Sequence, residues 1–146
     1  VLTDLPNRVA MQGRVAQLLT LAKEKSHPVA VLFVDLDRFK AINDSLGHHA
    51  GDAVLKGVAA RLKSCMRAAD VVSRLGGDEF VVVLPNTDEH GAKHVAQKIR
   101  DELSAPYLVD NHHLTVTPSI GISVYPPIDF QPKDSLMFLF AFDVGM

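Results

Sequence analysis

Three carboxylates lie at the ends of segments whose composition predicts strands. Asp35 follows an unbroken apolar run, and Asp78 and Glu79 occupy the tip of a predicted hairpin whose turn begins with Gly76 and Gly77. If the two strand ends adjoin, the acids form a cluster of hard oxygen ligands, which Mg²⁺ prefers and usually shares with substrate phosphates. The glycines have no side chains to hold a triphosphate away from the backbone. Acids and glycines together indicate a nucleotide site, although both are also ordinary turn residues.

The elements that position these residues follow from the spacing of apolar side chains. Helical spacing predicts a first helix, and a continuous apolar run predicts a central strand covered on both faces. The expected elements are a helix from about Pro6 to Lys25, a strand at 29–34, a two-helix region that follows Asp35 and ends near Cys65, strands at 70–75 and 80–84, a helix capped by Thr87 and Asp88 that runs to about Leu103, two short strands or one interrupted strand at 113–117 and 119–125, and a helix from Asp134. This order lacks regular strand–helix alternation, so we expect one α/β (α+β) domain with a mostly antiparallel sheet flanked by helices.

Composition restricts the partners of the chain. Its 146 residues are enough for one hydrophobic core. Its formal net charge of −2 gives no overall positive potential to attract nucleic acid. The single cysteine, Cys65, excludes an internal disulfide and favours a reducing cytoplasm. No apolar run reaches the roughly 20 residues that span a bilayer, so we expect a cytoplasmic domain without membrane contact of its own, whatever anchors the parent protein.

Several motifs carry a resemblance to a known family. The segment Arg74-Leu75-Gly76-Gly77-Asp78-Glu79-Phe80 resembles the signature of the GGDEF family of diguanylate cyclases. Other segments match the family in the expected order, namely 2–8, 33–40, Asn43-Asp44, Gly47-His48, Gly51-Asp52 and 119–123. The resemblance therefore covers the chain from residue 2 to about residue 125.

The resemblance implies a fold like that of adenylyl cyclases and polymerase palms, and an enzyme that condenses two GTP into cyclic di-GMP with loss of pyrophosphate. Each of two facing domains carries one GTP, so a homodimer is needed. The implied site residues are Asp35, Asp78 and the Leu36 carbonyl for Mg²⁺ or Mn²⁺, Glu79 as a ligand or base, Asp78 as another base, Lys40 for phosphate charge, Asn43, His48 and Asp52 for guanine, and Gly76 and Gly77 beside the phosphates. For Lys40 a solvated surface role stays open.

Two arginines near the signature have alternative interpretations. Arg67 and Asp70 match the family's Arg-x-x-Asp motif for inhibitory binding of its own product, cyclic di-GMP, although such pairs are also common surface ion pairs. Arg74 either serves phosphate charge or pairs with a neighbouring acid.

A regulatory module that binds GTP or cyclic di-GMP without catalysis is the alternative function. The family normally continues with a Tyr-x-Ala-Lys segment and a Gly-Arg, which the chain lacks because it stops at Met146. We therefore expect a single domain over 1–146, truncated at its C-terminal end and excised from a larger multidomain signalling protein, with reduced or no activity as a fragment. The segment 106–126 resembles domains followed by an EAL-type phosphodiesterase.

Overall fold

A computed structural model of the chain describes Leu5 and residues 8–125. The elements, in chain order, are α1 (Arg8–Lys25), β1 (Val29–Asp37), α2 (Phe39–Leu46), α3 (His48–Ser64), β2 (Val71–Gly76), β3 (Glu79–Pro85), α4 (Glu89–Ser104), β4 (Tyr107–Val109), β5 (His112–Leu114) and β6 (Thr117–Tyr125). The predicted helix from Asp134 lies outside the described residues.

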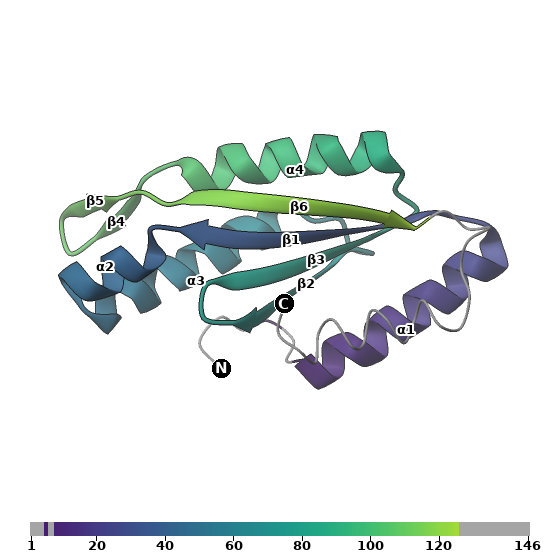
Figure 1. Cartoon of the computed structure of the whole chain (residues 1–146), viewed down its shortest axis with the longest axis horizontal. Helices are drawn as coiled ribbons and strands as arrows, with labels where there is room; N and C mark the ends of the chain where they lie inside the picture. The colour runs from purple at the N-terminus through teal and green to yellow at the C-terminus, as the bar shows by residue number, and fades with distance from the viewer. Residues whose placement is uncertain (1–4, 6–7, 126–146) are drawn as a thin grey trace.

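The central sheet has four strands in the order β2-β3-β1-β6, and every neighbouring pair is antiparallel. The apolar run of β1 therefore occupies an inner position, as its composition predicts. The expected mixed α/β fold, with an antiparallel sheet flanked by helices, is confirmed (Figure 1).

Each face of the sheet has its own apolar cluster, because alternate residues of β1 point to opposite faces. Val29 and Val31 pack with α1, whereas Ala30 and Leu32 pack with α3 and α4. Figure 1 shows α1 and α4 on opposite sides of the sheet. Both clusters include alternating residues of β3, so β1 and β3 are covered on both faces.

The hairpin between β2 and β3 turns at Gly77 and Asp78. Gly77 has a φ of +52°, a conformation that glycine adopts without steric cost. The pairing register shifts between Arg74 and Gly76, and Gly76 then pairs with Glu79. The glycines therefore permit a tight turn that places two acids at the strand end.

The segment after α4 differs from the prediction. A small hairpin, β4–β5, turns at Asp110 and Asn111, which both have positive φ, as two-residue hairpin turns of the primed type require. Strand β4 was not predicted from the sequence, because three residues are too few to show a clear alternation of apolar and polar side chains.

The prediction of two strands in this region is confirmed by β5 and β6, but the boundary at Pro118 was wrong, because β6 begins at Thr117 and runs through the proline. Strand β6 is an edge strand, where proline is tolerated. The N–H of its register partner Leu36 points toward the β2–β3 hairpin and donates to Asp78. The Leu36 carbonyl points to the same side, so it needs no N–H from Pro118.

Cys65 caps the C-terminal end of α3 and is 8% exposed. It packs within the cluster formed by α3, α4 and the sheet. Among the helices of the described residues, none combines the length and apolar character needed to cross a bilayer.

Candidate functional site

The predicted carboxylate cluster forms where β1 ends beside the β2–β3 turn. Asp35 is the register partner of Glu79, and the Leu36 N–H donates to the Asp78 carbonyl over 3.1 Å. Directly paired residues of an antiparallel sheet project to the same face, so Asp35 and Glu79 share one face. The sequence motifs 33–40 and 74–80 are therefore brought together at one edge.

The acids of the cluster influence one another. Partial desolvation, followed by the negative charges of Asp78 and Asp37, raises the pKa of Asp35 above its ordinary value. Desolvation, followed by Asp35 and Asp78, likewise raises the pKa of Glu79. Desolvation is the larger cause of both shifts, and the neighbouring negative charges add to it; a bound cation would favour the charged form of both acids.

The residues at this edge fit a divalent cation only as a partial ligand set. Within the described residues, no group of three or more His, Cys, Asp or Glu side chains is arranged to hold a metal ion. Two carboxylates and a backbone carbonyl, completed by substrate phosphates, are the usual way in which proteins bind Mg²⁺. The Leu36 carbonyl suits this set, because the N–H and C=O of one strand residue point to the same side, and its N–H already faces Asp78.

The hairpin tip leaves room for a ligand. Gly76 and Gly77 are exposed, and a Cβ at either position would meet no atom within 4 Å. Arg74 is engaged locally, because its Nε donates to the Gly77 carbonyl over 3.0 Å. That bond to a backbone carbonyl was not among the interpretations of Arg74 from sequence, and it ties the arginine to the turn.

A fourth acid is fixed beside the cluster. The Ser119 hydroxyl donates to the Asp37 carboxylate over 2.9 Å, which joins the start of β6 to the end of β1. Sequence reasoning did not assign Asp37 or Ser119 a site role, because their contact depends on the pairing of strands far apart in the chain.

The residues predicted to read guanine lie where α2 meets α3. Figure 1 shows α2 and the β2–β3 turn at the same end of β1. His48 and Asp52 are exposed in the first turns of α3, and Lys40 is exposed in the first turn of α2. Asn43 is half-buried, and its Oδ1 is buried without a hydrogen-bond partner in the described part of the chain.

Gly51 packs against the Asn43 amide and was not among the predicted site residues. A Cβ at position 51 would overlap the Asn43 Oδ1 and lie 2.8 Å from its Cγ. The available signal was a glycine in the first turns of a helix, immediately before Asp52.

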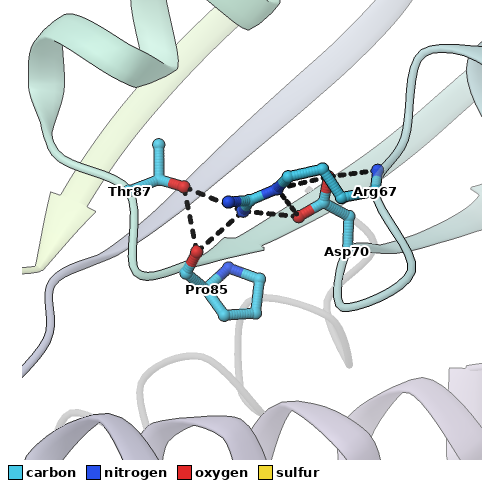
Figure 2. A network of polar contacts seen from close by, with 4 residues as sticks. All are labelled: Arg67, Asp70, Pro85 and Thr87. Atoms are coloured by element: carbon cyan, nitrogen blue, oxygen red, sulfur yellow. Dashed lines mark hydrogen bonds and ion pairs between the residues drawn. The ribbon is translucent and has the colours of Figure 1, made fainter. Parts of the chain in front are cut away.

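Arg67 and Asp70 pair with each other at the end of β2 and β3 opposite the turn. The Arg67 Nη2 lies 2.7 Å from the Asp70 carboxylate and also donates to the Pro85 carbonyl and the Thr87 hydroxyl over 2.8 and 3.1 Å (Figure 2). The Asp70 carboxylate accepts the Arg67 backbone N–H as well. The Arg67 side chain is 55% exposed, whereas that of Asp70 is 2% exposed. Arg67 therefore contributes most of the solvent-exposed side-chain surface of this ion pair.

Comparison with known proteins gives one family model, described as "Diguanylate cyclase, GGDEF domain", which matches residues 1–138. Among curated relatives, the bifunctional diguanylate cyclase/cyclic di-GMP phosphodiesterase MucR of Pseudomonas aeruginosa is 43% identical over 136 residues, covering 93% of this chain and 20% of MucR. The chain spans 29% or less of the length of the first curated relatives that it matches.

Two solved structures are similar over nearly the whole chain. The GGDEF domain of TpbB from Pseudomonas aeruginosa is 39% identical with a TM-score of 0.83, covering 99% of this chain and 88% of that one. The GGDEF domain of DgcB from Caulobacter crescentus, crystallised in complex with c-di-GMP, is 27% identical with a TM-score of 0.83, covering 99% and 89%. The motifs therefore occur in a matching fold.

Proposed function

The chain belongs to the GGDEF family of diguanylate cyclase domains, and from that premise we propose that it condenses two GTP molecules into cyclic di-GMP. The observation that carries the proposal is the meeting of Asp35, Asp78 and Glu79 at one sheet edge beside an open glycine turn.

The reaction consists of two identical transfers. The 3′-hydroxyl oxygen of each GTP attacks the α-phosphorus of the other, a new P–O bond forms, and the bond from the α-phosphorus to the bridging oxygen breaks. Pyrophosphate leaves with the bond electrons, and the hydroxyl proton passes to a base. Two domains that face each other, each with one GTP, satisfy this symmetry, so the active unit is a homodimer.

The residues of the edge divide these tasks. Asp35, Asp78 and the Leu36 carbonyl are the proposed ligands of Mg²⁺ or Mn²⁺, and Glu79 or Asp78 accepts the hydroxyl proton. When bound, the cation supplies charge neutralisation at the phosphates and lowers the pKa of the hydroxyl. The exposed Lys40, in the first turn of α2, adds a positive charge for the phosphates.

Guanine recognition is assigned to the start of α3 and the end of α2. The Asp52 carboxylate accepts from guanine N1–H and the exocyclic amino group, and the Asn43 amide donates to O6. Adenine has an acceptor at N1 and an amino donor at C6, where guanine has N1–H and O6. Asp52 and Asn43 would therefore lose these hydrogen bonds, which disfavours binding of adenine. The exposed His48 borders the same corner.

Product inhibition is proposed at Arg67 and Asp70. DgcB was crystallised with c-di-GMP, which supports a product site in the family. In this chain the Arg67 side chain is 55% exposed and carries a guanidinium suited to phosphate or the guanine edge, whereas the Asp70 side chain is 2% exposed beneath it. We therefore expect Arg67 to contribute most of the contact with the product.

Incubation of the full-length parent protein with GTP and Mg²⁺, followed by chromatographic separation of nucleotides, tests the proposal. We expect cyclic di-GMP and pyrophosphate from the unmodified parent, and neither from its Asp78→Ala variant. GTP binding without product formation would favour the alternative regulatory module. No GTP binding would reject both.

The parent protein is proposed to be a larger multidomain signalling protein. The relative MucR carries both cyclase and phosphodiesterase in its name, which supports a neighbouring EAL-type domain as one arrangement.

A further inference from the structure

The corner between α2 and α3 brings Asn43 and Gly51 together. Gly47, with a φ of +86°, separates the two helices, and its N–H donates to the Asn43 carbonyl over 2.9 Å. The Gly51 N–H in turn donates to the Gly47 carbonyl over 3.3 Å. These bonds end α2 and begin α3, and the Asn43 side chain lies against Gly51 across the turn between them.

A side chain at position 51 has no room in this arrangement. A Cβ there would overlap the Asn43 Oδ1, and would lie 2.8 Å from the Asn43 Cγ and 3.3 Å from the Phe39 Cζ. Phe39 is buried and cannot move freely, so the Asn43 amide would have to rotate away. Glycine is also a poor residue for a helix interior, so its presence in α3 requires a packing reason.

The position of the Asn43 amide is itself costly. Its Oδ1 is buried, and no donor in the described residues reaches it. A buried acceptor without a donor loses its bond to water and gains nothing in return. Two unfavourable features, a helical glycine and an unsatisfied oxygen, therefore coincide at one contact beside the proposed guanine site.

We propose that Gly51 is a positioning residue for base selection. Because Gly51 has no Cβ, it leaves the space that the Asn43 amide occupies when its NH₂ group donates to guanine O6. The role rests on the proposed function, in which Asn43 donates to O6 and Asp52 accepts from N1–H and the amino group. Loss of the fixed amide should therefore weaken recognition of O6 and leave recognition of the amino group intact.

A thermal double-mutant cycle tests the packing without nucleotide. Because alanine is the better helix former, Gly51→Ala in the Asn43→Ala background should raise the melting temperature, by at most roughly 2–4 °C because the 3.3 Å contact with the Phe39 Cζ remains. In the unmodified background the collision with Asn43 should cancel or reverse that gain. Gly13→Ala is the matched control, because Gly13 lies in α1 with nothing within 4 Å of its Cβ, and it should give the same gain in both backgrounds. Equal gains from Gly51→Ala in both backgrounds would refute the packing.

Base selection is measured with three triphosphates, namely GTP, 6-thio-GTP and inosine triphosphate, in a competition assay against an α,β-methylene GTP analogue that cannot react. The unmodified chain should bind GTP about tenfold more tightly than 6-thio-GTP, because sulfur is a weak hydrogen-bond acceptor. Tenfold in affinity corresponds to the contribution of about one hydrogen bond. Gly51→Ala should lose this preference and keep the preference over inosine triphosphate, which lacks the amino group.

The outcomes separate the two proposals. If the unmodified chain binds GTP and Gly51→Ala keeps its preference over 6-thio-GTP, the role of Gly51 is wrong and the proposed function stands. If the unmodified chain binds no guanine nucleotide, the proposed function is wrong and the role of Gly51 in base selection falls with it. Gly13→Ala should leave all three affinities unchanged, and a change there would identify a general stability effect.

Discussion

Replacement of Arg67 by alanine should destabilise the fold even without any ligand. The guanidinium pairs with Asp70 and donates to Pro85 and Thr87, and its removal leaves the Asp70 carboxylate, whose side chain is 2% exposed, without its cation. A hydrogen bond to a charged group contributes about 1.5–3 kcal/mol. Because the Arg67 side chain is 55% exposed, solvent replaces much of this, and we expect a loss of about 2 kcal/mol in the free energy of unfolding.

Equilibrium unfolding in urea, followed by far-ultraviolet circular dichroism, measures this loss. At this chain length about 2 kcal/mol corresponds to a fall of roughly 6 °C in melting temperature. The matched control is Arg100→Ala, because Arg100 is exposed on α4 and contacts Gln97 over 3.3 Å, so its loss should stay below about 0.5 kcal/mol. If Arg67→Ala and Arg100→Ala differ by less than about 0.5 kcal/mol, the network in Figure 2 does not stabilise the fold.

Arg61, Tyr107 and Asp35 give three further predictions. Arg61→Ala should cost about 2 kcal/mol in urea unfolding, because Arg61 donates to the carbonyls of Ala105 and Pro106 and stacks 3.6 Å over the Tyr107 ring; Arg61→Lys should recover only part of it. Burial raises the pKa of Tyr107 in the folded chain. The free energy of unfolding should therefore decrease as the pH rises above about 10, because the tyrosine of the unfolded chain loses its proton first. In alkaline melting curves, the melting temperature of Tyr107→Phe should decrease less steeply with pH. Asp35→Asn should reduce cyclic di-GMP formation by at least about 100-fold and abolish any rise in melting temperature on adding Mg²⁺, and retention of both would exclude Asp35 as a ligand.

The sequence predicted the segments that carry the acids of the cluster. The apolar run that ends at Asp35 and the turn that contains Asp78 and Glu79 were both recognisable from their residue types. The pairing of β1 with β3, which places Asp35 opposite Glu79, was not visible in the periodicity. The meeting of the two strand ends therefore stayed a condition until the structure showed it.

The sequence was insufficient where contacts depend on how helices meet. The contact between Asn43 and Gly51 requires the turn at Gly47, and no periodic pattern encodes the angle of that turn. The hydrogen bonds from Arg67 to Pro85 and Thr87 likewise join the α3–β2 loop to the end of β3, 18 and 20 residues away. Long-range contacts of single side chains therefore had to come from the structure.

The burial of Cys65 gives the chain an intrinsic reporter of local opening. It is the sole cysteine of the sequence, and burial raises the pKa of its thiol, so little reactive thiolate is available in the closed state. A thiol-labelling reagent should react only when the end of α3 opens. Because Cys65 lies two residues before Arg67, its labelling rate would follow the opening of this region without an introduced dye or a second cysteine.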